Sequence, residues 1–364
     1  MISMNQEFPL ALPVGSVLAG QYIIERVLGQ GGFGITYQAL DHKTGKKVAV
    51  KEFFPDTLVT RTNTITVTPY TGDRMVDFGY GKACFTQEAE TLAKFIGNPN
   101  IVRIHTYFEE NQTAYFVMEY VDGISFDRYI RKNGGKVTYE DAKRILFPIM
   151  EALYRVHKAG IVHRDVTPDN IYITNSGEIK LLDFGAARYS LGDKTKSLDV
   201  ILKKGFAPIE QYSRRGKQGP FTDVYSLGAT FYYALCGHKP PDSIDRIEKD
   251  TLVSLSSRGI VLPKEEELAI YKALSVRPED RFQTMKEFGA PFLNGMKKPL
   301  AQYANPAMQY PAGNQMPNES LINRNSARKA VDNQTSSKKS WVIPVIIIGA
   351  IVLVVAICLL IYFL

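Results

Sequence analysis

The chain of 364 residues is long enough for one large domain with two lobes or for two ordinary domains. Its content of 45% hydrophobic and 22% charged residues is typical of a globular protein with a core, which excludes a chain that is disordered throughout. The net charge of +7 is mild, so we expect no nucleic acid partner. The three cysteines, Cys84, Cys236 and Cys358, lack metal-ligand spacing, and we expect no disulfide framework.

The first half of the chain after a leader at 1–19 is rich in strand patterns. Short apolar and β-branched runs such as "YIIERVL", "KKVAVKEFF" and "TAYFVMEY" follow one another, with one helical pattern near 82–96. From about residue 122 the patterns are longer and helical, as in "YEDAKRILFPIMEALYRVHKAG". Strands followed by helices predict an α+β protein with a small lobe at about 20–121 and a large lobe at about 122–292.

A glycine-rich stretch, "LGQGGFGITY", carries Gly29, Gly31 and Gly34 in a G-x-G-x-x-G pattern. Glycines let a backbone approach phosphate oxygens closely. The residues that follow favour a strand, which predicts a hairpin flap rather than the helix start of a dinucleotide site. Lys51 follows 17 residues after Gly34 and is a candidate to hold phosphates. Of the nearby carboxylates we select Glu88, which shares a helix face with Leu92.

Two further motifs follow in the second half, "HRDVTPDN" at 163–170 and "LLDFG" at 181–185. Asp165 lies five residues before Asn170 and 18 before Asp183. Together with the glycine stretch, "VAVKEFFP" and "GFAPIEQY", this order resembles the eukaryotic-like (Hanks-type) serine/threonine protein kinases, and bacterial members most of all. The resemblance covers about residues 20–292.

The resemblance implies a bilobal protein-kinase-like fold and transfer of the ATP γ-phosphate to protein Ser/Thr hydroxyls. By that resemblance, Asp165 would accept the proton of the substrate hydroxyl. Asn170 and Asp183 would hold Mg²⁺, with Mn²⁺ as an alternative, through oxygen ligands.

The same resemblance assigns the nucleotide contacts. Lys51 and Glu88 would form an ion pair, with Lys51 on the α- and β-phosphates. The Glu119 carbonyl and the Val121 N–H would contact the adenine edge.

Three further residues receive structural roles from the resemblance. Glu210 would pair with Arg281 in the helical lobe. Asp223 would brace the backbone of the catalytic loop, and His163 would pack beneath that loop.

Thr167 stands where the resembled family has a lysine that contacts the γ-phosphate. Lys203, seven residues before Glu210, stands where the family has a threonine. We interpret this as an exchange in which Lys203 brings the cation to the same small space, with Lys204 as a substitute. In the alternative, Lys203 is an ordinary surface loop residue.

The activation segment, about 183–210, suggests regulation by phosphorylation. Arg164 would bind a phosphate on Ser190, Thr195 or Ser197, after self-association and trans-autophosphorylation. The alternative for the whole chain is a pseudokinase, a nucleotide-binding membrane scaffold without phosphotransfer.

The end of the chain predicts a membrane anchor. Residues 341–364, "WVIPVIIIGAIVLVVAICLLIYFL", carry no charge and would form a helix of about 36 Å, enough for a bilayer core of about 30 Å. Residues 293–340 have the composition of a disordered juxtamembrane linker. We expect a single-pass protein of the cell membrane with the kinase domain in the cytoplasm. The linker's basic residues contact anionic lipid head groups or only set the topology: Arg324, Arg328, Lys329, Lys338 and Lys339.

Overall fold

The computed structural model describes residues 8–61, 65–95, 97–184, 202–213 and 216–293. The chain divides into two units, 1–308 and 309–364, and every described residue belongs to the first. The predicted membrane segment 341–364 and almost all of the predicted linker lie outside the described residues. Within the described part, no helix is both long and apolar enough to cross a membrane.

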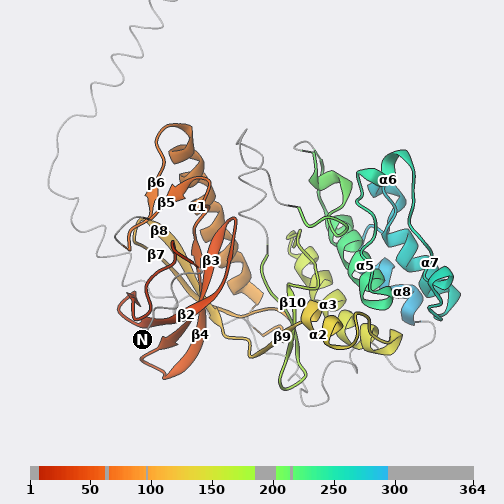
Figure 1. Cartoon of the computed structure of the whole chain (residues 1–364), viewed down its shortest axis with the longest axis horizontal. Coiled ribbons are helices and arrows are strands. Elements are labelled where there is room, and N and C mark those ends of the chain that lie inside the picture. Colours follow the sequence, from red (N-terminus) through yellow and green to blue (C-terminus); the bar gives the residue numbers. More distant parts are fainter. Residues whose placement is uncertain (1–7, 62–64, 96, 185–201, 214–215, 294–364) are drawn as a thin grey trace, which may run out of the picture. The chain divides into compact units, whose positions relative to one another are not determined.

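The small lobe is built on a six-stranded antiparallel sheet with the order β1-β2-β3-β4-β8-β7 (Figure 1). Its strands are β1 (Val17–Leu18), β2 (Tyr22–Gly31), β3 (Gly34–Asp41), β4 (Lys46–Phe53), β7 (Ile104–Glu110) and β8 (Thr113–Glu119). Helix α1 (Asp73–Leu92) packs against β7 and β8 and is followed by the 3-10 helix η2 (Ala93–Phe95). Strand β8 is buried along almost its whole length because it lies inside the sheet and beneath α1.

Helix α1 begins at Asp73, nine residues before the predicted start near 82, and this prediction was wrong at its first boundary. The first turns present Met75 and Val76 to solvent, so they show no apolar stripe in the sequence. Gly72, with φ of 73°, directly precedes the helix, and Asp73 places a negative charge in the first turn.

We name the segment around residues 60–80 the insertion, and its first part contains a hairpin. Strands β5 (Val59–Thr60) and β6 (Thr68–Pro69) pair with each other, and Val67 is fully buried. The described part of the predicted leader also packs on the small lobe, where Leu12 and Leu18 are both buried. Both segments therefore extend the core of the small lobe.

The large lobe is mainly helical (Figure 1). Its elements are α2 (Phe126–Lys132), α3 (Tyr139–Lys158), α5 (Pro220–Cys236), α6 (Asp245–Glu248), α7 (Lys264–Ala273), α8 (Met285–Leu293), and the 3-10 helices η3 (Ile209–Gln211), η4 (Ser256–Arg258) and η5 (Pro278–Asp280). Helix α3 begins where the Thr138 hydroxyl accepts a hydrogen bond from the Asp141 N–H at 3.1 Å. It buries one face against α5 and α8, and α5 is buried on nearly all sides. The predicted division into a sheet lobe and a helical lobe is confirmed.

A second small sheet carries the catalytic segments. Strands β9 (Gly123–Ser125), β10 (Ile171–Thr174) and β11 (Ile179–Leu181) are antiparallel in the order β11-β10-β9. The motif at 163–170 runs directly into β10, and Asp183 lies two residues after β11. The hairpin of β10 and β11 thus brings the two motifs side by side.

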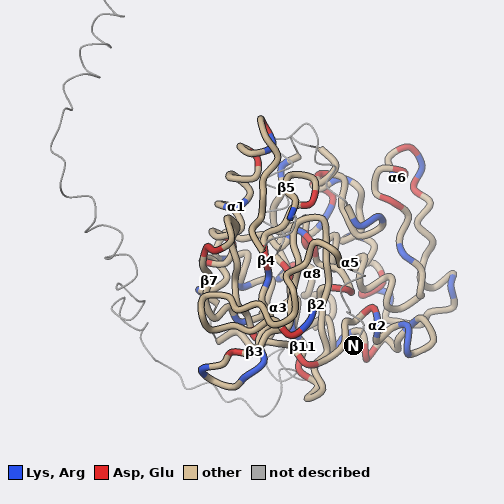
Figure 2. The backbone as a smooth tube through the Cα atoms, turned by 60° about the vertical axis from the view of Figure 1, so that its left-hand side comes forward, with Lys and Arg blue, Asp and Glu red and all other residues tan. Residues whose placement is uncertain are grey.

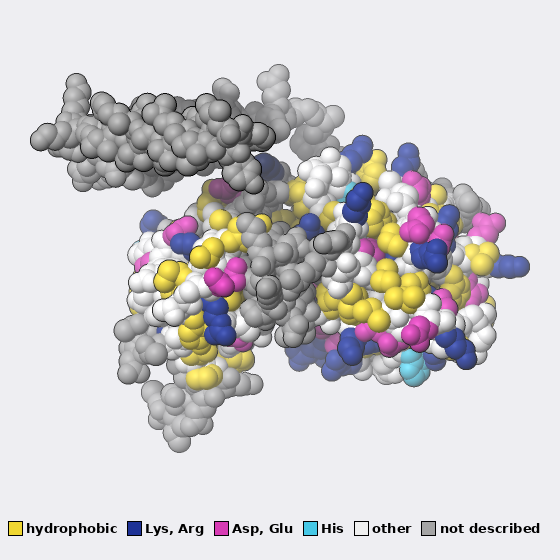
Figure 3. Space-filling model, turned by 90° about the horizontal axis from the view of Figure 1, so that it is seen from above, with side chains coloured by type: hydrophobic (Ala, Val, Ile, Leu, Met, Phe, Trp, Pro, Cys, Tyr) yellow, Lys and Arg dark blue, Asp and Glu magenta, His cyan; other side chains and the backbone are white. Residues whose placement is uncertain are grey.

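Acidic and basic residues are interspersed along the described backbone (Figure 2). On the face shown in Figure 3, the described side chains form no extended area of one charge.

Candidate active site

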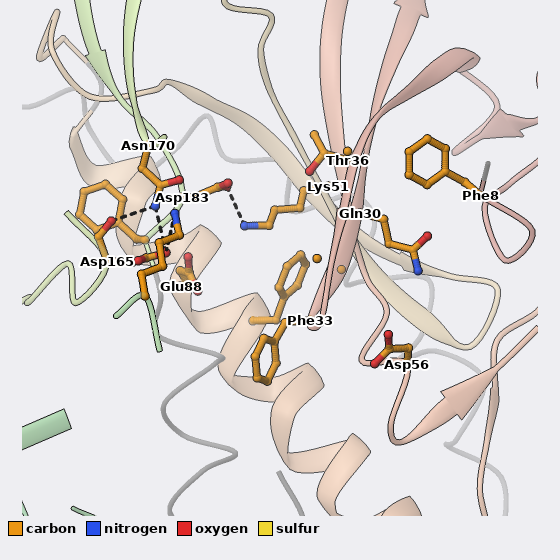
Figure 4. A pocket seen from close by; sticks show the side chains of 17 residues that line it. Phe8, Gln30, Phe33, Thr36, Lys51, Asp56, Glu88, Asp165, Asn170 and Asp183 are labelled. Atoms are coloured by element: carbon orange, nitrogen blue, oxygen red, sulfur yellow. Dashed lines mark hydrogen bonds and ion pairs between the residues drawn. The ribbon is translucent and has the colours of Figure 1, made fainter. Parts of the chain in front are cut away.

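A cavity of about 890 Å³ is lined by residues of both lobes (Figure 4). Nine of the predicted site residues line it: Gly29, Gly31, Gly34, Lys51, Glu88, Asp165, Asn170, Asp183 and Lys203. They come from the β2–β3 turn, β4, α1, the loop before β10 and the segments after β11. Residues far apart in the sequence therefore meet around one space.

The glycine stretch forms the turn between β2 and β3, in which Gly31 pairs with Gly34. A Cβ atom at Gly34 would collide with the carbonyl oxygen of Glu52 on β4. Gly29 and Gly31 have open space at the same position. Glycine is therefore required sterically at Gly34, where the backbone of β3 lies against the Glu52 carbonyl.

Lys51 extends from β4 toward Asp183, and its Nζ lies 2.7 Å from Oδ1 of that carboxylate (Figure 4). Burial would lower the pKa of Lys51, but the carboxylates of Asp183 and Glu88 more than offset this and raise it. Burial would likewise raise the pKa of Asp183, and the Lys51 ammonium holds it below its usual value. Both groups are therefore charged at neutral pH.

The structure corrects the prediction that Lys51 forms an ion pair with Glu88. Among the described residues, the ion pair recorded for the Lys51 ammonium is with Asp183. Asp183 has φ of 55°, and its carboxylate lies directly against Nζ. Glu88 is buried on α1, lines the same cavity and acts on Lys51 through its charge.

Asn170 ties the catalytic loop together. Its Nδ2 donates to the backbone carbonyl of Asp165 at 2.8 Å and to Oδ2 of the same residue at 3.0 Å. These two bonds fix the carboxylate of Asp165 toward the cavity, where the side chains lie close together in Figure 4. The amide oxygen of Asn170 remains available as a hard oxygen ligand.

Asp223, at the start of α5, braces this loop as predicted. Its carboxylate accepts hydrogen bonds from the backbone N–H groups of His163 at 2.8 Å and Arg164 at 2.7 Å, and lies 2.7 Å from Nε2 of His157. Burial would raise the pKa of Asp223, but His157 and His163 more than offset this and lower it. His163 is fully buried, with its ring 4.3 Å from that of Phe184, in agreement with a structural role.

The predicted pair in the helical lobe is also present. Arg281 donates from Nη1 and Nη2 to the two carboxylate oxygens of Glu210, at 2.8 and 3.1 Å. Both side chains are buried, and Arg281 also donates to the carbonyls of Ser275 and Val276. The segment that ends at Glu210 is thereby anchored to the large lobe.

Lys203 and Thr167 meet at the edge of the cavity. The Lys203 ammonium donates to the Thr167 hydroxyl at 2.8 Å and to Asp169 Oδ2 at 3.3 Å. It also lies 3.9 Å from Oδ2 of Asp165. A cation therefore stands beside the carboxylate that the sequence marks as the proton acceptor.

The predicted hinge residues lie at the end of β8 and just after it. Neither Glu119 nor Val121 is among the described residues that line the cavity. The Glu119 carboxylate accepts hydrogen bonds from the Arg103 N–H at 2.9 Å and from Lys180 Nζ at 2.8 Å. These bonds connect the end of β8 to its neighbours, and the adenine contacts of the backbone stay a prediction.

Several residues that line the cavity were missed in the sequence, among them Phe8, Gln30, Phe33 and Asp56. Gln30 and Phe33 lie within the glycine stretch and could have been suspected from that position alone. Phe8 and Asp56 belong to no motif. Only the packing of the chain brings them to the cavity.

The profile of the protein kinase domain matches residues 22–287. The chain belongs to the protein kinase family. The serine/threonine-protein kinase PknA of Mycobacterium tuberculosis strain H37Rv is 32% identical over 236 residues, which cover 62% of this chain and 49% of that protein. PrkC of Bacillus subtilis strain 168 is 29% identical over 284 residues, 76% of this chain and 41% of that kinase. The serine/threonine-protein kinase F of a Synechocystis species is 29% identical over 313 residues, 81% and 59% of the two chains.

The described fold also resembles a solved structure, the apo form of PpkA-294, with a TM-score of 0.70 and 34% identity. That match covers 78% of this chain and 99% of the solved chain. The chain spans about half the length of the curated relatives that it matches.

Proposed function

We propose that the chain is a serine/threonine protein kinase that transfers the γ-phosphate of ATP to protein Ser/Thr hydroxyls. The convergence of Lys51, Asp165, Asn170 and Asp183 on one cavity carries this proposal. The names of the relatives, which are serine/threonine-protein kinases, support the choice of Ser/Thr hydroxyls as acceptors.

Asp165 is the proton acceptor in this proposal. Its carboxylate, oriented by Asn170, takes the proton of the attacking hydroxyl as the hydroxyl oxygen bonds to the γ-phosphorus. The bond between this phosphorus and the β-phosphate oxygen breaks, and ADP leaves. Lys51 carries its positive charge on β4 beneath the glycine turn, where it can hold phosphate oxygens. The Gly29, Gly31 and Gly34 backbone forms the cover over those oxygens.

The oxygen donors of Asn170 and Asp183 fit Mg²⁺, with Mn²⁺ as an alternative. Among the described residues, no group of three or more His, Cys, Asp or Glu side chains could hold a metal alone. Two protein donors completed by phosphate oxygens are a usual arrangement for Mg²⁺ in phosphoryl transfer. When bound, the ion would neutralise negative charge on the phosphates.

We propose that Lys203 supplies the cation that the resembled family places at the position of Thr167. Its ammonium is the right group at the right edge of the cavity, 3.9 Å from Asp165. A positioned cation stabilises charge on the transferred phosphoryl group.

We also propose trans-autophosphorylation of the activation segment after self-association. Ser190, Thr195 and Ser197 lie outside the described residues, so the support is the sequence and the position of Arg164. The backbone N–H of Arg164 donates a hydrogen bond to the Asp223 carboxylate, and its carbonyl accepts one from Gln211 Nε2 at 2.7 Å. These bonds fix the backbone of Arg164, and a guanidinium is suited to bind a phosphate.

The membrane location is part of the same proposal. Residues 341–364 would anchor the kinase domain on the cytoplasmic face, with the lipid bilayer, and anionic head groups near the linker, as partners. Separating membranes from cytosol by centrifugation tests it: the full chain should sediment with membranes, and a chain ending at 340 should not. Equal distributions of the two proteins would contradict the anchor.

The decisive experiment compares the full chain with Asp165→Asn. Both proteins should bind ATP with Mg²⁺, and only the wild type should phosphorylate a Ser/Thr peptide library. Mixing Asp165→Asn with active wild type, and mapping phosphate on 186–206 by mass spectrometry, tests the trans reaction. Equal phosphate signals from wild type and Asp165→Asn, or none with either metal, would refute the kinase proposal.

A further inference from the structure

Glu52 follows Lys51 on β4, so its side chain points to the opposite face of the sheet, away from the cavity. It is 0% exposed, which is exceptional for a carboxylate. Three donors satisfy it: the Tyr115 hydroxyl at 2.7 Å, the Tyr37 hydroxyl at 2.7 Å, and Nη2 of Arg61 in an ion pair. Burial raises the pKa of the Glu52 carboxyl, and Arg61 opposes this effect.

Two segments outside the sheet are fastened at this carboxylate. Arg61 belongs to the insertion and directly follows β5. Its Nη1 donates to the carbonyl of Leu10 at 2.7 Å. The N–H of Leu12 donates to the same Tyr37 hydroxyl that binds Glu52, at 3.0 Å.

We name residues 8–18 the N-terminal arm. Leu12 is 1% exposed, and the arm continues into β1, which pairs with β2. The Gly15 N–H donates to the carbonyl of Ile24 at 2.8 Å, which fastens the arm to the strand that leads into the glycine stretch. The arm is therefore bound both to β2 and, through Glu52, to β4.

The first described residue of the arm lines the same cavity as the glycine turn. Phe8 is partly buried and lines the cavity together with Gln30, and in Figure 4 the ribbon of β2 and β3 passes between Phe8 and Lys51. The turn has a second attachment at β4. The Phe54 N–H donates to the carbonyl of Phe33 at 3.1 Å, and the Glu52 carbonyl lies against Gly34.

We propose that the N-terminal arm is a positioning element for the glycine turn, with Phe8 bracing the turn from outside and Tyr37, Glu52 and Arg61 anchoring the arm. The inference rests on the proposed function, because it takes the turn to cover the phosphates of ATP. A loop that is ordered before binding loses less conformational freedom when the ligand arrives. Loosening the arm should therefore weaken ATP binding and leave the chemical step nearly unchanged.

The two tyrosines provide a matched pair of variants. Both are 0% exposed, and each donates one hydrogen bond of 2.7 Å to Glu52. The Tyr37 hydroxyl also accepts from the arm, whereas the Tyr115 hydroxyl accepts from Asn111 Nδ2 at 3.2 Å. Tyr37→Phe therefore removes an anchor of the arm, while Tyr115→Phe removes a comparable bond without touching the arm.

The test measures KM for ATP, kcat and the Kd of Mg·ATP on the full chain. We expect Tyr37→Phe and Phe8→Ala each to raise KM and Kd by about three- to tenfold with kcat within about twofold, as for a loop ordered on binding. Tyr115→Phe, and Val14→Ala at a 62% exposed position of the same arm, should leave both constants within about twofold. Thermal melting measures stability separately from KM and kcat. Both tyrosine variants should lose stability to a similar degree, so a higher KM in Tyr37→Phe alone does not come from a loss of stability.

The double variant Phe8→Ala, Tyr37→Phe tests whether the two residues act through one element. The KM of the double variant should equal the KM of the single variant with the larger effect, because an arm that is already released cannot be released again. Additive effects, equal KM values for the two tyrosine variants, or an unchanged KM in Phe8→Ala would overturn the inference. If Tyr37→Phe does not fold, Phe8→Ala beside Val14→Ala decides.

The two proposals fail in different ways. A wild type that binds Mg·ATP but transfers no phosphate refutes the kinase proposal, while the Kd values still decide on the arm. A wild type that phosphorylates normally, with Kd values that do not separate Tyr37→Phe from Tyr115→Phe, refutes the arm alone. A wild type that binds no nucleotide overturns both.

Discussion

The ammonium nitrogen of Lys203 lies 2.8 Å from the hydroxyl oxygen of Thr167, and donates a hydrogen bond to it. Thr167 is 1% exposed, so its hydroxyl has a fixed place within the catalytic loop. The contact joins the segment before Glu210 to the loop that carries Asp165. The resembled family has a lysine at the position of Thr167 and a threonine at the position of Lys203. In this chain the two residue types are exchanged and share one small space.

If Lys203 supplies the cation for transfer, Lys203→Ala should lower kcat by about 10²-fold, the size of effect seen when one stabilising donor is lost. Lys204→Ala is the matched control, because Lys204 is the next residue and is exposed. Steady-state peptide phosphorylation measures both. Near wild-type turnover in Lys203→Ala would contradict the role.

The exchange also predicts a rescue. Thr167→Lys alone places a second ammonium beside Lys203, and Lys203→Thr alone removes the cation. Each single variant should lose most of its activity, and the double variant should recover at least about tenfold over either, since it restores one cation to the site. Activities that simply multiply in the double variant would count against a shared space.

Gly34→Ala should disturb nucleotide binding, because the new Cβ would strike the Glu52 carbonyl and displace the turn. We expect KM for ATP to rise by at least about tenfold, as for an overpacked contact of roughly 1–3 kcal/mol. Gly79→Ala introduces the same methyl into open space on α1, away from the turn, and is the control. Comparable KM values for the two variants would show that steric room at Gly34 is unimportant.

Breaking the buried pair of Glu210 and Arg281 should reduce stability strongly. Glu210→Ala leaves the 0% exposed guanidinium of Arg281 without its carboxylate, and we expect unfolding to become easier by about 3–5 kcal/mol. Arg144→Ala removes the exposed partner of Asp141, a surface pair that contributes roughly 0–1 kcal/mol. Urea unfolding measures both, and a loss of similar size in the two variants would contradict the argument.

The low pKa of Asp223 predicts a pH dependence. A carboxyl whose pKa is lower in the folded state than in the unfolded state stabilises the fold above the unfolded value, about 3.9, and loses this effect as pH falls through the folded value. The difference in unfolding free energy between wild type and Asp223→Asn should therefore be constant from about pH 5 to pH 8 and shrink below about pH 4.

Urea unfolding at a series of pH values checks this, with Asp122→Asn as the control because Asp122 is exposed. The control should show a small difference at every pH. A difference for Asp223→Asn that grows as the solution is acidified would have the wrong sign.

Much of the candidate site followed from the sequence because its motifs describe local backbone. The spacing of Asp165, Asn170 and Asp183 reflects a loop followed by the β10–β11 hairpin, which is a short stretch of chain. The start of α1 was misplaced for an equally local reason. Met75 and Val76 face solvent, so the first turns of the helix lack an apolar stripe.

Other features depend on contacts between distant segments. Two carboxylates were available to the Lys51 ammonium, and the choice of Asp183 rather than Glu88 depends on which one lies within reach in the folded chain. Lys203 and Thr167 lie 36 residues apart in the sequence. The position of Lys203 seven residues before Glu210 only suggested that the two side chains meet.

The sequence by itself determined the two lobes, the order of the phosphate-handling motifs and the residues that carry their chemistry, because periodicity and short spacings are properties of the chain. Only the tertiary structure decided that the N-terminal arm and the insertion meet at Glu52. The reason is physical: a buried carboxylate must find donors, and its donors Tyr37, Arg61 and Tyr115 lie 15, 9 and 63 residues away along the chain. No local pattern encodes such a meeting, which arises when burial of the surrounding apolar side chains brings these segments together.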